Sequence, residues 1–153
     1  EREAPQQFDV LALDAFSSGS IPAHLLTREA FVVYTRHLAP ERGVLALHVS
    51  NRYLDLEPLV VTLAREQGLV AGVVRLSEPL PAHIWGSTWI LLAARAEWLP
   101  PQADALAVER AVVWTDNYSN LLQTVRWTRR EEGSPAEIMK QINEEARYLD
   151  PLR

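Results

Sequence analysis

The chain has 153 residues, of which 48% are hydrophobic and 23% are charged, and its net charge at pH 7 is −5. This length and composition are typical of one globular domain with its own core, and the 15 basic residues, which form no run longer than Arg129–Arg130, argue against a nucleic-acid surface. The absence of cysteine excludes disulfides, thiolate nucleophiles and cysteine-based zinc sites. No apolar run approaches the roughly 20 residues of a membrane span, so we expect a soluble, cytoplasmic protein.

Strands and helices are predicted to alternate through the first half of the chain. Residues 8–14 are almost continuously apolar, as in a strand that is covered on both faces. Thr27 is a good N-cap for the helix that follows, and residues 43–50 form a second apolar strand. Asp55 is predicted to cap a second helix, which Gly68 ends.

Two further strands are predicted at residues 69–76 and 87–95. The segment between them has no helical periodicity, so we expect these strands to form an antiparallel hairpin at one edge of the sheet. The whole order of elements is typical of an α/β fold with parallel crossovers.

The last third of the sequence contains a polar cluster and a predicted helix. The cluster, Asp-Asn-Tyr-Ser-Asn at 116–120, either lines the mouth of a pocket or is a structural turn. A capping box at Ser134 begins a helix that runs to about residue 149. We therefore expect a partial domain over residues 1–130 and a C-terminal helical extension over residues 131–153.

The first predicted strand ends on a carboxylate, Asp14, which the small polar residues 17–20 follow. In open α/β sheets, ligands bind at the carboxyl ends of the strands. Asp14 is therefore either a ligand-binding group or a cap for the loop. The six glycines form no G-x-G cluster, so the sequence lacks the phosphate-binding turn that usually opens a nucleotide-binding domain.

Three segments resemble the second half of the catalytic domain of spermidine synthases, the aminopropyltransferases: "FDVLALDAFSSGSIP", "LLTREAFVVYTRHLAPERGVLALH" and "PAHIWGSTWILLAA". Four shorter segments are similar to segments of bacterial spermidine synthase-like proteins: "DAFSS", "HLLTREAF", "SNRYLDLEP" and "WTDNYSNLL". Some of those proteins are fused to multi-pass membrane segments. The resemblance runs from about residue 8 to residue 125.

The resemblance implies the C-terminal half of a Rossmann-like sheet of the class I S-adenosylmethionine methyltransferase type. It also implies a transferase of polyamine biosynthesis, which moves an aminopropyl group from decarboxylated S-adenosylmethionine to a small amine or polyamine, or a methyl group from S-adenosylmethionine. Asp14 matches the first of two family aspartates that hold the amine and help to deprotonate it. The cofactor's Gly-rich loop belongs upstream, so we expect this chain alone to be inactive and to bind the cofactor weakly.

Five further residues are candidates for substrate binding, and most depart from the family pattern. Ser17 replaces the second aspartate, His48 replaces a glutamine, and His83 replaces a tyrosine, whereas Trp85 is an inserted aromatic and Trp89 matches a family tryptophan. His48 is a base, a ligand or a structural histidine, and the two tryptophans either wall an aliphatic chain or pack within the fold. We expect no metal site, because the histidines show no ligand spacing with carboxylates.

A second hypothesis is a degenerate, non-catalytic module that assembles with a partner or regulates a fused membrane protein. The substitution at Ser17 favours this alternative, and the retention of Asp14 disfavours it. Under either hypothesis we expect a homo-oligomer, since a half sheet exposes a long edge that pairs with other chains.

Overall fold

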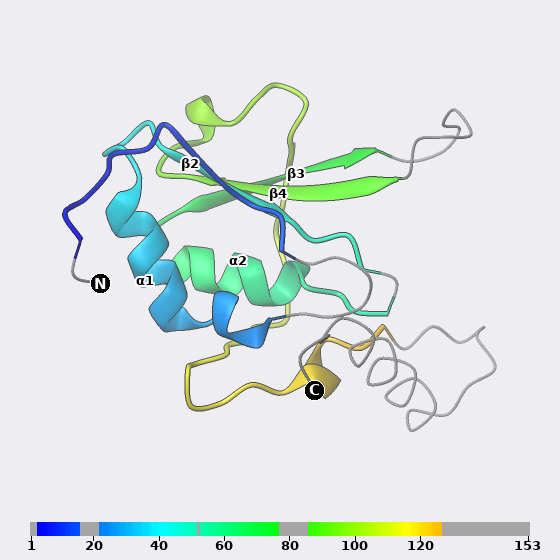
Figure 1. The fold of residues 1–153 in the computed structure, drawn as a ribbon. Coiled ribbons are helices and arrows are strands. Elements are labelled where there is room, and N and C mark those ends of the chain that lie inside the picture. Colours follow the sequence, from blue (N-terminus) through cyan, green and yellow to red (C-terminus); the bar gives the residue numbers. More distant parts are fainter. Residues whose placement is uncertain (1–2, 16–21, 52, 77–85, 127–153) are drawn as a thin grey trace.

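The computed structural model describes residues 3–15, 22–51, 53–76 and 86–126, and they form an α/β fold with one five-stranded sheet (Figure 1). Its strands are β1 (Val10–Leu13), β2 (Val44–His48), β3 (Val70–Leu76), β4 (Ser87–Ala93) and β5 (Asp104–Ala105). Its helices are α1 (Arg28–His37) and α2 (Glu57–Glu66), with short 3-10 turns at Ala23–Leu25, Ala96–Trp98 and Leu121–Gln123. The α/β class predicted from the sequence is confirmed.

The strands lie in the order β1-β2-β4-β3-β5, and the pairing is mixed. The pair β1–β2 is parallel, and the other three pairs are antiparallel. Because β2 and β3 both run opposite to β4, the three strands β1, β2 and β3 point in the same direction. The sheet therefore combines three strands of one direction with a reversed strand between two of them.

The predicted hairpin of β3 and β4 forms, but its predicted place at an edge was wrong. Strand β4 lies inside the sheet between β2 and β3, and β5 pairs with the outer side of β3. The physical reason is the apolar character of β4, in which Ile90, Leu92 and Ala93 are fully buried. An apolar strand of this kind belongs to the interior of a sheet, where β2 and β3 flank it.

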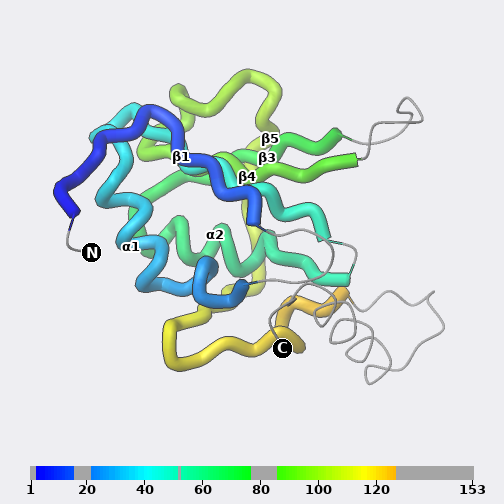
Figure 2. The backbone as a smooth tube through the Cα atoms, viewed as in Figure 1, coloured from blue at the N-terminus to red at the C-terminus, as the bar shows by residue number. Residues whose placement is uncertain are grey.

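Both helices lie on the same face of the sheet, where they cover the core (Figure 1). The side chains that point toward them from the two central strands include Leu45, Leu47, Ile90 and Leu92, all fully buried in one apolar cluster. In Figure 2 the same layering is visible, with α1 and α2 below the strands. Among the described residues, neither α-helix lies on the other face of the sheet.

The predicted helix boundaries are mostly correct, with one exception. Thr27 caps α1 as predicted, because its Oγ1 accepts the backbone N–H three residues along at 3.2 Å. Gly68 ends α2 with a φ of 71°, a conformation that glycine adopts without strain. Asp55, in contrast, is not the N-cap: Leu56 holds that position, and the Asp55 carboxylate accepts the N–H of Glu57 at 3.2 Å instead.

Several predicted features lie outside the described residues. They are Ser17, the segment 77–85 that contains His83 and Trp85, and the helix and extension over residues 131–153. In the part of the chain that is described, no helix is both long enough and apolar enough to cross a membrane.

Candidate functional site

A short row of side chains crosses the sheet at the carboxyl ends of β1 and β2. Asp14 follows the last residue of β1, His48 is the last residue of β2, and Trp89 pairs with His48 from the neighbouring β4. Side chains alternate between the two faces of a strand. Since Leu13 and Leu47 pack toward the helices, the residues that follow them, Asp14 and His48, point to the opposite face.

Asp14 and His48 are in direct contact. The His48 Nδ1 and the Asp14 Oδ1 are 2.6 Å apart, which is a short hydrogen bond, as bonds to ionised groups tend to be. The Asp14 side chain is 64% exposed, whereas that of His48 is 23% exposed. The carboxylate therefore has a second oxygen open to solvent while its first oxygen is held by the imidazole.

The second ring nitrogen of His48 is buried. Its Nε2 has no hydrogen-bond partner among the described residues. An ionised carboxylate only accepts hydrogen bonds, so the proton of the short contact belongs to Nδ1. In the neutral imidazole this leaves a lone pair on Nε2. A buried polar atom without a partner is uncommon in folded proteins, and an ordered water or ion is one common explanation.

Trp89 fixes the plane of the imidazole. The rings of His48 and Trp89 are stacked, with their centroids 4.9 Å apart and their planes at 19°. The indole thus prevents the imidazole from turning away from Asp14. Trp89 was expected either to wall an aliphatic chain of a substrate or to pack within the fold. The stacking on His48 is a contact of the second kind.

Two polar residues lie just after β2, and sequence reasoning gave neither of them a role. The Ser50 Oγ accepts the backbone N–H of Thr88 at 2.7 Å, which ties the start of β4 to the end of β2. The Asn51 Oδ1 accepts the N–H groups of Tyr53 and Leu54 at 2.9 and 2.8 Å, and its buried Nδ2 has no partner in the described ranges. The signal was present in the sequence as a Ser-Asn pair directly after a strand.

The polar cluster at 116–120 has a structural role at the start of α1. Thr115 and Tyr118 exchange backbone hydrogen bonds of 2.8 and 3.0 Å, which close a turn. The Thr27 hydroxyl donates to the Asp116 carboxylate at 2.7 Å, and the Asp116 N–H donates to the Glu29 carboxylate at 3.0 Å. These contacts attach the turn to the helix N-terminus and not to the carboxyl ends of the strands.

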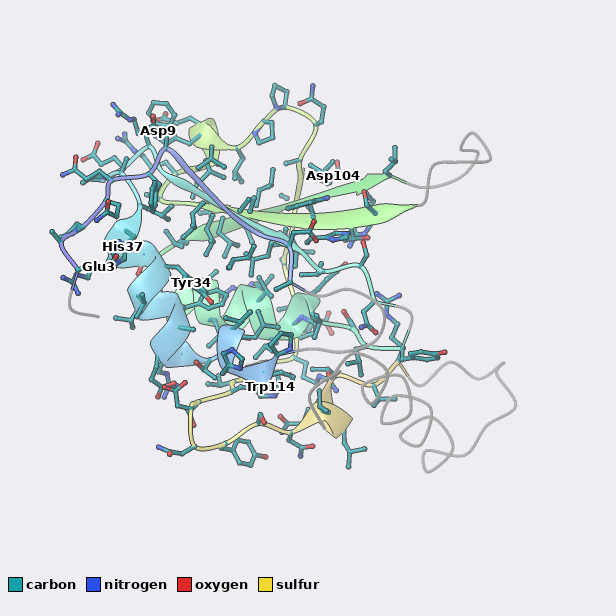
Figure 3. The ribbon with its side chains drawn as sticks, in the orientation of Figure 1. Glu3, Asp9, Tyr34, His37, Asp104 and Trp114 are labelled. Carbon is teal, nitrogen blue, oxygen red and sulfur yellow. The ribbon has the colours of Figure 1, made fainter. Side chains whose placement is uncertain are left out.

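The resolved pKa shifts belong to the helical layer of the molecule. The ion pair between Arg28 of α1 and Glu66 of α2 raises the pKa of the guanidinium and lowers the pKa of the carboxyl group. Burial raises the pKa of the Tyr34 phenol, whose hydroxyl donates to the backbone carbonyl of Leu25 (Figure 3). These groups stabilise the scaffold and lie away from Asp14.

Neither a metal nor an S-adenosyl cofactor is fitted by the described residues. Among them, no three histidine, aspartate or glutamate side chains gather closely enough to hold a metal ion. An S-adenosyl cofactor of the expected kind needs a Gly-rich turn between a strand and a helix, and none of the six glycines supplies a G-x-G sequence. The residues that the chain does supply are a carboxylate, an imidazole and an indole.

Comparison with known proteins gave no relative: no family model, no curated protein and no solved structure matches this chain.

Proposed function

We propose that this chain is the acceptor half of a spermidine synthase-like transferase, in which Asp14 binds the amine that receives the transferred group. The observation that carries the proposal is the Asp14 carboxylate at the carboxyl end of β1, held by His48 at 2.6 Å and open on its other oxygen. A carboxylate in this position can localise an ammonium group, and general-base groups in such sites help to remove its proton.

The proposed reaction needs the amine in its neutral form. A sulfonium cofactor would supply the activated carbon and the leaving group, and the amine would lose one proton as it forms the new bond. The sulfonium belongs to an S-adenosyl cofactor, which this chain alone does not fit, so the role proposed for its residues is to hold the amine and receive that proton.

The proposed fold is the C-terminal half of a class I methyltransferase-type sheet. It is supported by the common direction of β1, β2 and β3 and by the two crossover helices on one face. The reversed β4 supplies the antiparallel strand that this expectation includes, although at an interior position.

The proposed acceptor is a small amine that presents one ammonium group to Asp14. In the resemblance, Ser17 stands where the family has its second aspartate, and Ser17 carries no charge. A charge-assisted hydrogen bond contributes roughly 1.5–3 kcal/mol, so one carboxylate distinguishes less between a monoamine and a diamine than two carboxylates do. We therefore expect putrescine and butylamine to compete for the same place.

The test is a transfer assay with the full-length product of the gene. Decarboxylated S-adenosylmethionine is supplied with putrescine, and the aminopropylated product is detected by mass spectrometry. Asp14→Asn should lower turnover by roughly 10²–10⁴-fold, the usual contribution of a general base. Asp9→Asn is the matched control: Figure 3 shows Asp9 at the other end of β1, where it pairs with Arg42. Equal turnover in the Asp14 and Asp9 variants would refute the proposal.

A further inference from the structure

The sheet face that carries Asp14 is apolar along β1 and β2. Side chains at every second position of a strand share a face, so Val10 and Ala12 lie on the same face as Asp14. The parallel register places Val44 and Ala46 of β2 beside them. We call these four residues the apolar strip, and the Asp14 carboxylate lies at its end.

The half of the apolar strip that belongs to β1 is open to solvent. Val10 is 64% exposed and Ala12 is also exposed, as is the Asp14 side chain. Strand β1 lies at an edge of the sheet, and neither α-helix covers this face among the described residues. A ligand therefore reaches the carboxylate and the strip directly from solvent, without a cavity or an opening.

We propose that the site selects an amine with one ammonium group and an unbranched alkyl tail. The ammonium binds the Asp14 oxygen that His48 does not hold, and the tail lies along β1 over Ala12 toward Val10. A cation then meets an anion and an apolar chain meets an apolar surface. This inference rests on the proposed function and deepens it, because it names the class of acceptor.

The length of the strip determines which tails gain affinity. A strand rises about 3.3 Å per residue, so Ala12 lies roughly 7 Å and Val10 roughly 13 Å from Asp14 along β1. The tail of butylamine ends near Ala12, whereas that of octylamine continues toward Val10. A fully buried CH₂ raises affinity about fourfold, and a tail on an open face is covered on one side only, so we expect about twofold for each added CH₂.

A diamine matches the same surface less well. When putrescine lies along β1, its second ammonium is placed over Ala12, where the apolar strip supplies no hydrogen-bond acceptor. A charge that loses water without gaining a partner is unfavourable. If the second ammonium stays in solvent instead, the carbon chain gives up its contact with the strip. Butylamine should therefore bind at least as tightly as putrescine.

The first test is a calorimetric titration of the isolated chain at neutral pH with butylamine, hexylamine, octylamine and putrescine, at equal ionic strength. We expect the affinity to rise through the alkyl series, with octylamine about 10- to 20-fold tighter than butylamine. Equal affinities across the series, or tighter binding of putrescine than of octylamine, would overturn the inference.

The second test adds a carboxylate where the second ammonium of a diamine would lie. Ala12→Asp should raise the affinity for putrescine relative to butylamine by about tenfold and weaken octylamine, since a charge-assisted hydrogen bond replaces an apolar contact. Ala105→Asp is the matched control, because Ala105 is also exposed, changes the net charge equally and lies in β5 at the other edge of the sheet. Circular dichroism checks that both variants fold. An equal change in both variants would be a general charge effect and would contradict the proposal.

A third test separates this inference from the proposed function. The full-length gene product is assayed for transfer to octylamine and to putrescine. A kcat/KM for putrescine equal to or above that for octylamine would refute the alkylamine preference and leave the transferase intact. Absence of transfer to either amine, with the alkyl preference retained in the binding titration, would refute the transferase and support the alkylamine site.

Discussion

The attachment of the 115–118 turn to helix α1 gives a sharp stability prediction at Thr27. This side chain is 1% exposed, its oxygen accepts the N–H of Ala30 at 3.2 Å, and its hydroxyl donates to Asp116 at 2.7 Å. Thr27→Val preserves the shape of the side chain and removes both hydrogen bonds. Helix α1 connects β1 to β2, so Thr27 also supports the scaffold that brings Asp14 to His48.

The magnitude follows from the two bonds. Loss of an N-cap costs about 1 kcal/mol, and a hydrogen bond to a charged group contributes roughly 1.5–3 kcal/mol. The second value is reduced here because Asp116 is exposed and its carboxylate is hydrated in the variant. We therefore expect Thr27→Val to lower the free energy of unfolding by about 1–3 kcal/mol, or about 2–4 °C in Tm for each kcal/mol.

The assay is urea unfolding at neutral pH, followed by tryptophan fluorescence, with Thr35→Val as the matched control. Thr35 lies in the last turn of the same helix, and its hydroxyl donates to the Phe31 carbonyl one turn earlier at 2.9 Å. Its replacement leaves no helix N–H without a partner, so we expect a change within about 0.5 kcal/mol, as is usual away from caps and cores. If Thr27→Val is no more destabilising than Thr35→Val, the capping argument is refuted.

Three further predictions concern the scaffold. Gly43→Ala should lower the free energy of unfolding by roughly 1–3 kcal/mol in the same urea assay, because a Cβ at this position would lie 2.8 Å from the Ala39 backbone; unchanged stability would contradict the close approach. Burial raises the pKa of Tyr34, so the stability due to its neutral phenol is present below the ordinary pKa of 10.0 and is lost as pH rises above it. Tyr34→Phe should therefore flatten the alkaline limb of a plot of Tm against pH. Arg28 lowers the pKa of Glu66, so the stability due to the ionised carboxylate is present above the ordinary pKa of 4.5 and is lost as pH falls. Glu66→Gln should therefore flatten the acid limb of the same plot. For either variant, a curve parallel to that of the wild type would contradict the argument.

The helices and strands could be predicted from the sequence because their signals are local. Thr27 stands at a helix start and Gly68 at a helix end, and the structure places a cap and a stop at these residues. The wrong cap at Asp55 has a local cause as well, since the same carboxylate can accept an N–H from just outside the helix. Errors of one residue at helix ends are to be expected from such competition.

The order of the strands could not be predicted in the same way. Two strands that are neighbours in sequence usually pair, and β3 and β4 do so. Whether the second of them then inserts beside β2 depends on contacts between distant segments, such as the pairing of Leu47 with Ile90. The continuous apolar run of β4 was the available signal for an interior position.

The candidate site was predicted in its parts and not in its geometry. Asp14 and His48 were each assigned to the carboxyl end of a predicted strand. Their 2.6 Å contact follows from the parallel register of β1 and β2, which brings the two positions side by side one step beyond Leu13 and Leu47. The stacking of His48 on Trp89 depends on the insertion of β4, so the sequence alone could not supply it.

The measurement that tests the central claim most directly is an amide and indole NMR titration of this chain with putrescine. If Asp14 and His48 form an amine site, saturable shifts should concentrate at Asp14, His48 and the indole N–H of Trp89. They should disappear in Asp14→Asn and persist in Asp9→Asn, which changes net charge by the same amount. Shifts that spread over the acidic surface, or that are the same in both variants, would contradict the account.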